Sequence, residues 1–100
     1  MKDLERKFHD DMIQIYRSAK SLKYNASYFI QMVTEKGGYA AAKQLIHTDT
    51  PSAGFVKLWE LHRLDLSVEA LVVKPEYTLL FTDEERQICQ NRLCEYGYVV

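Results

Sequence analysis

Histidine, cysteine and carboxylate side chains are the groups in this chain that could bind a metal ion. The densest such group is the triplet His9-Asp10-Asp11. Consecutive side chains of a helix point about 100° apart, so these three cannot converge on one ion without ligands from elsewhere. Cys89 and Cys94 stand five residues apart and lack the close spacing of a zinc site. We therefore expect no metal site and no cofactor, and interpret the triplet as a solvated helix face.

Nucleophilic catalysis would need a serine or cysteine activated by a nearby base. His62 falls on the apolar face of a predicted helix, which favours a core or boundary position over a catalytic role. Cys89 also lies on an apolar face and is interpreted as a small core residue. Cys94 has Gln90, and no cation, one helical turn before it, so nothing indicates an activated thiolate. We predict no catalytic residues and a chain that is not an enzyme.

A second polar group alternates with apolar residues between Arg63 and Glu69. Asp65 and Ser67 are alternative N-caps for the helix that follows, and Glu69 suits the dipole of its first turn. Arg63 can pair with Asp65 or stack on Trp59. These structural roles are favoured over a functional surface patch.

The elements that position these side chains follow from apolar residues spaced three or four apart through nearly the whole chain. From Leu4 to Leu22 this spacing predicts one long amphipathic helix over about residues 3–22. A second helix is capped at Asn25 or Ser27 and closes at Gly37-Gly38. Further helices are expected at about 39–47, 51–63, 67–73 and 82–96, and the segment 76–81 is predicted to be irregular or a single turn. The predicted fold class is all-α: one domain, residues 1–100, with five or six short helices.

Capping residues indicate where the later helices begin. Thr50 followed by Pro51 predicts the start of the fourth helix, since proline suits the first helical position. Ser67 predicts the start of the fifth. Thr82 and Glu85 have the spacing of a capping box at the start of the last.

The charges of the chain are balanced, with a formal net charge of −1. This removes the generic attraction to nucleic acids and anionic lipids. The helices at 51–63 and 67–73 outline a helix-turn-helix, but the second starts with the apolar and acidic run Ser67-Val68-Glu69-Ala70-Leu71 and lacks base-reading side chains. It also lies in the half of the chain whose net charge is −3, against +2 for the first fifty residues. Because of the helix-turn-helix outline, nucleic-acid binding is kept as the alternative function, and the charge and residue types make it the less favoured one.

Membrane insertion and secretion are not expected. The longest apolar runs are four or five residues, whereas a membrane span needs about 20. The charged start, Met1–Lys7, has no apolar stretch of a signal peptide. Cys89 and Cys94 would point about 140° apart on a helix and so are not expected to bridge. Free thiols favour a cytoplasmic location.

A longer pattern extends over about residues 4–98. It comprises Gly37-Gly38, Ala40–Ala42, Leu45, Gly54–Trp59, Arg63–Val72, Pro75, Leu80–Thr82 and Glu85. In this pattern the chain resembles a family of small bacterial all-helical domains of unknown function. Members stand alone or are appended to larger proteins, including nuclease- or restriction-related ones. The resemblance implies a bacterial cytoplasmic origin and an accessory role, and it carries over no catalytic residue.

Aromatic content points to a surface that binds another molecule. The chain has seven tyrosines, a residue type enriched at protein interfaces. The equally weighted alternative is that most of them rim the core with their hydroxyls in water. We predict a non-catalytic protein–protein interaction or accessory module whose partner is another protein or a fused domain. The candidate interaction surface comprises Tyr24, Tyr28, Tyr39, Trp59, Arg63 and Tyr77.

Overall fold

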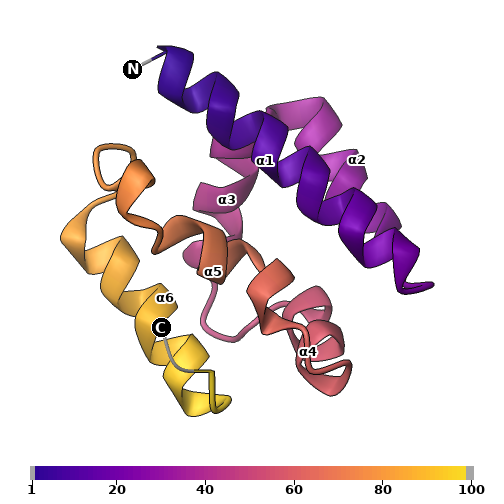
Figure 1. Ribbon diagram of the computed structural model, residues 1–100. Coiled ribbons are helices and arrows are strands. Elements are labelled where there is room, and N and C mark those ends of the chain that lie inside the picture. The colour runs from indigo at the N-terminus through magenta and orange to yellow at the C-terminus, as the bar shows by residue number, and fades with distance from the viewer. Residues whose placement is uncertain (1, 99–100) are drawn as a thin grey trace.

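The computed structural model describes residues 2–98, which form six α-helices and two short 3-10 turns with no strand in that range (Figure 1). The helices are α1 (Lys2–Ser21), α2 (Ser27–Lys36), α3 (Gly38–Ile46), α4 (Ala53–Glu60), α5 (Val68–Val72) and α6 (Asp83–Glu95), and the turns are η1 (Leu64–Leu66) and η2 (Pro75–Tyr77). The predicted all-α fold class is confirmed.

The helices enclose one core, with the shortest of them at its centre. Helix α1 packs on α2 and α3, while α5 contacts α3, α6 and η1. In Figure 1, α5 lies in the middle of the molecule, with α1 on one side and α6 on the other. All five residues of α5 are buried. A helix hydrophobic on every side belongs inside a domain, which is where the apolar run Ala70–Val73 places it.

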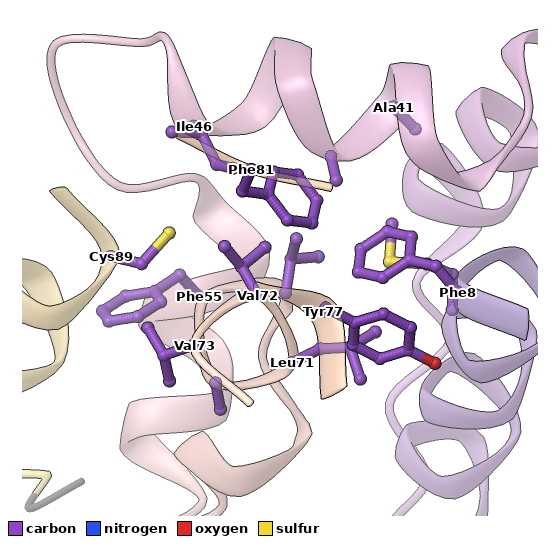
Figure 2. Close-up of a cluster of buried hydrophobic side chains, with 14 of the residues drawn as sticks. Phe8, Ala41, Ile46, Phe55, Leu71, Val72, Val73, Tyr77, Phe81 and Cys89 are labelled. Atoms are coloured by element: carbon purple, nitrogen blue, oxygen red, sulfur yellow. The ribbon is translucent and has the colours of Figure 1, made fainter. Parts of the chain in front are cut away.

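Aromatic rings hold α1 to the segment that follows α5. The Phe8 ring packs edge-on against Tyr77 and Phe81, with ring centroids 5.0 and 5.2 Å away. Figure 2 shows the Tyr77 ring beside Phe8, and its hydroxyl donates a hydrogen bond to the carboxylate of Asp11. Edge-to-face pairs of this kind contribute beyond the area that they bury.

His9 has a structural role that its neighbours in sequence do not indicate. The backbone N–H of Gly38 donates to His9 Nδ1 at 2.8 Å, which satisfies a free donor at the start of α3. The same contact brings the two backbones together. A Cβ placed on Gly38 would lie 2.7 Å from His9 Cα, so only glycine fits there.

The start and end of α4 differ from the prediction of 51–63. The N-cap is Ser52, whose Oγ accepts the Phe55 N–H at 3.1 Å, so Thr50 is not the cap and Pro51 precedes the helix. The helix ends at Glu60 because His62 adopts a left-handed conformation (φ 59°). His62 is exposed, and its predicted place on an apolar helix face is wrong.

A Schellman motif causes this early end. The N–H of His62 donates to the Trp59 carbonyl at 3.0 Å, and the N–H of Arg63 donates to the Leu58 carbonyl at 2.8 Å. This pair of bonds closes helix C-termini around a residue in the left-handed region, commonly glycine. A histidine occupies that position here, so the sequence carries no obvious stop signal.

The predicted N-caps of the second helix are wrong, whereas its predicted end at Gly37 is confirmed. The N-cap of α2 is Ala26, with no side-chain hydrogen bond. The Asn25 side chain instead accepts a hydrogen bond from the Tyr16 hydroxyl at 3.1 Å, and Ser27 is the first residue of the helix.

The capping box at the start of α6 is confirmed and does more than cap. Thr82 Oγ1 accepts the Glu85 N–H at 3.1 Å, and Glu85 Oε1 accepts the Thr82 N–H at 3.0 Å. The same carboxylate binds Lys43 Nζ at 2.6 Å and His47 Nε2 at 2.7 Å. Glu85 therefore ties α6 to the end of α3.

Candidate functional site

An apolar groove of about 560 Å³ lies between α1, α2, α4 and the start of α5, and we call it the α1–α4 groove. Its apolar lining includes Ile15, Ala19, Phe29, Met32, Leu45, Ala53, Phe55, Leu58, Leu66 and Val68. Binding sites for small molecules and side chains commonly enclose about 300–1,000 Å³ with mostly apolar walls. The groove has the size and the character of such a site.

The turn between α1 and α2 positions the tyrosines of this groove. Lys23 adopts a left-handed conformation (φ 67°), and the Tyr24 N–H donates to the Ala19 carbonyl at 3.1 Å. The turn directs Tyr24 toward α4, where a Cβ on Gly54 would lie 3.2 Å from the Tyr24 hydroxyl. Tyr28, at the start of α2, also lines the groove and is 70% exposed. The groove is thus bordered by side chains with an apolar ring and a polar end.

Glu69 is the one charged residue among the described residues that line the groove. It is 4% exposed, and its Oε2 accepts a hydrogen bond from Arg92 Nη1 at 3.2 Å. Burial raises the pKa of Glu69 above its ordinary value, and a backbone hydrogen bond to the carboxylate and the charge of Arg92 oppose that rise. The groove therefore combines apolar walls with a single buried carboxyl group.

Arg92 divides its hydrogen bonds between Glu69 and the end of α3. Nη1 also donates to the Leu45 carbonyl at 3.1 Å, and Nη2 donates to the Thr48 carbonyl. Carbonyls at a helix C-terminus carry partial negative charge, so they share the positive charge of the guanidinium. Arg92 is itself buried.

Sequence reasoning missed this pair. The sequence pattern assigns Glu69 to the dipole of its helix, and it does not identify Arg92 as a partner. A signal was present, since Arg92 stands three residues after Cys89 and four before Tyr96 on the face of α6 that carries apolar residues. An arginine on such a face needs a buried anionic partner.

The candidate interaction surface does not form one patch. Tyr24 and Tyr28 lie at the α1–α4 groove. Trp59, 44% exposed, instead packs edge-on against Tyr96, at a centroid distance of 5.4 Å. Arg63 forms a two-bond ion pair with Asp65, at 3.0 and 3.1 Å, as one of its predicted roles requires.

The two remaining tyrosines of that set serve the core. Tyr77 is fully buried, so it does not belong to a surface. Its ring fills the space beside Phe8, which the sequence pattern around η2 did not show. Tyr39 is half-buried and donates a hydrogen bond to the Leu80 carbonyl at 2.7 Å. Tyr77 is thus a core residue, and Tyr39 lies at the edge of the core with its hydroxyl bonded to the backbone.

The described residues 2–98 also show no arrangement suited to base catalysis by His62, to thiol catalysis by Cys89 or to metal binding. His62 is exposed and does not line the α1–α4 groove, so it supplies no base to that groove. Burial raises the pKa of the Cys89 thiol to about 12, which leaves it protonated at neutral pH. Within residues 2–98, no three His, Cys, Asp or Glu side chains gather in a way that could hold a metal ion. In the same range, none of the helices combines the length and apolarity needed to cross a bilayer.

Comparisons with models of known families, with curated proteins and with solved structures found no match. The resemblance to small bacterial helical domains therefore stays a prediction, and functional argument depends on the groove.

Proposed function

We propose that this chain is a non-catalytic interaction module that holds an apolar segment of a protein partner in the α1–α4 groove. The proposal depends on the groove itself, which encloses about 560 Å³ and has apolar walls from five helices, α1 to α5. Apolar concavities of this size on a small domain are typical of binding sites.

The size of the groove indicates what part of a partner it would take. It is several times larger than the ~150 Å³ cavity that accommodates one benzene molecule, so it has room for two or three apolar side chains. Tyr24 and Tyr28 at the edge supply the amphipathic rings common at protein interfaces. An amphipathic helix that inserts one face between α2 and α4 would use the helix-in-groove mode of recognition.

The partner is a separate protein or a domain fused to this one, and the location is the cytoplasm. Cys89 and Cys94 are both free thiols, which supports a reducing compartment.

Burial of helix α5 argues against the alternative function, a helix-turn-helix that binds nucleic acid. A recognition helix must enter the major groove of DNA with its side chains exposed. Helix α5 would have that role, and its five residues are all buried between α3 and α6. The predicted recognition element is thus part of the core.

A matched pair of variants tests the proposal. Ala53 is exposed and lines the groove, while Ala40 is exposed on α3 and does not line it. Peptides selected from a displayed random library on the wild-type chain should bind it with micromolar Kd. Ala53→Arg, which places a long cation at the groove, should weaken this binding at least about tenfold, because an arginine both obstructs the space and costs free energy to desolvate. Ala40→Arg should leave it unchanged.

Equal binding of the selected peptides to all three chains would place their site elsewhere and overturn the proposal. Circular dichroism and thermal unfolding of both variants check that each one folds.

A further inference from the structure

The electrostatics of the α1–α4 groove restrict what its occupant can be. Every described lining residue other than Glu69 is apolar or neutral. Glu69 is only 4% exposed to solvent. A charge in such a setting interacts strongly with a nearby opposite charge, because few water molecules screen it. The groove thus has one electrostatic contact to offer.

Arg92 does not use up that contact. Its guanidinium reaches Glu69 through one hydrogen bond of 3.2 Å, to Oε2. Its remaining bonds run to the Leu45 carbonyl and to Thr48 at the end of α3. Among residues 2–98, no side chain donates to Glu69 Oε1. Oε1 of the carboxylate consequently retains capacity to accept a hydrogen bond from a ligand.

We propose that the partner segment places a lysine in the groove, with its aliphatic stem along the apolar walls and its ammonium at Glu69. The inference rests on the proposed function and adds the chemistry of the anchor. Lysine suits the site because its four-carbon stem buries well while its compact ammonium forms hydrogen bonds at the tip. An acidic anchor would be repelled by the negative charge of Glu69. A wholly apolar anchor would displace water from Glu69 and offer no hydrogen-bond donor in its place.

A series of small probes with one stem and three head groups tests this anchor chemistry. The probes are n-hexylamine, n-hexanol and hexanoate, each titrated at pH 7.5 into the isotope-labelled chain while backbone amide shifts of groove residues are followed. Hexylamine, protonated at this pH, should bind about five- to tenfold tighter than hexanol, as charge-assisted hydrogen bonds are stronger than neutral ones. Hexanoate should bind most weakly.

Variants locate the preference. In Glu69→Gln, which keeps the shape of the side chain and can still accept from Arg92, hexylamine and hexanol should bind alike. The matched control is Glu76→Gln, since Glu76 is exposed and does not line the groove; it should retain the wild-type preference. If Glu69→Gln does not fold, the head-group ranking in the wild-type chain still tests whether the groove prefers a cation.

The outcomes separate the two proposals. Groove shifts with all three probes at equal affinity, or a preference for the amine that survives Glu69→Gln, would overturn the lysine anchor and leave the groove as a binding site. An absence of groove shifts with every probe would count against the groove itself, and so against the proposed function. In library-selected peptides, replacing the anchoring lysine with norleucine should weaken binding to the wild type and not to Glu69→Gln.

Discussion

At the scale of single residues, the buried pair of Glu69 and Arg92 is the feature with the largest consequence. Both side chains are less than a tenth exposed, and their contact joins α5 to α6 and, through Leu45, to α3. Desolvation of two charges offsets much of their attraction, so the pair itself stabilises the fold little. Its energetic importance appears when one partner is removed.

Arg92→Met should destabilise the chain by about 3–5 kcal/mol, because it leaves Glu69 buried without its cation. Urea unfolding of the variant measures the loss. The matched control is Arg63→Met, which removes the exposed ion pair with Asp65 and should cost less than about 1 kcal/mol.

The double variant Glu69→Leu, Arg92→Met should recover most of the loss, since both charges are then gone. Equal and small effects of Arg92→Met and Arg63→Met would show that Glu69 is hydrated in solution.

At the scale of elements, local signals predicted most helices and long-range packing decided the rest. The bounds of α1, α3 and α6 lie within one or two residues of expectation, because amphipathic spacing and caps such as Thr82 are encoded within a few positions. The end of α4 was missed because His62 takes a left-handed conformation that its residue type does not demand.

The α1–α4 groove could not be predicted at all, because its walls come from helices far apart in sequence. Tyr24 and Tyr28 were singled out from residue type alone and do lie there. Tyr77 was singled out on the same ground and lies in the core. Residue type thus distinguishes poorly between a tyrosine at a surface and one beside a buried phenylalanine.

The Schellman motif at the end of α4 leads to a prediction about backbone strain. His62→Gly should stabilise the chain by about 0.5–1 kcal/mol, because a left-handed non-glycine residue costs roughly 1–2 kcal/mol and glycine loses less than that in backbone entropy. Thermal unfolding measures the change. Glu60→Gly, within the last turn of the same helix, should instead destabilise by about 1 kcal/mol through lower helix propensity.

A destabilising His62→Gly would mean that contacts of the imidazole outweigh the strain of the left-handed backbone.

At the scale of the whole molecule, Glu85 couples global stability to pH. Burial alone would raise its pKa, but the hydrogen bonds from Lys43, the Thr82 N–H and His47 lower it to about 2, against an ordinary value of 4.5. A carboxyl group with a lowered pKa stabilises the folded state above its unfolded pKa, and this contribution disappears as the pH falls through the folded one.

The urea midpoint of the wild-type chain should therefore fall as the pH drops from about 5 towards 2. Glu85→Gln, which retains the capping-box geometry, should start from a lower midpoint at neutral pH and vary less over this interval. If the urea midpoints of both chains fall equally with pH, other carboxylates cause the loss of stability in acid. Glu69, with a raised pKa, contributes in the opposite direction: protonation relieves its burial.

The central place of α5 also bears on how the chain acquires its structure. A helix of five residues does not persist alone in water, since so short a segment cannot recover the cost of nucleation. Its stability depends on contacts with α3, α6 and η1, so we expect the domain to fold as one cooperative unit. Because Glu69 belongs to α5, the anionic base of the groove exists only in the finished fold. A ligand that recognises this carboxylate binds the native state alone, and its concentration sets how far the unfolding equilibrium shifts.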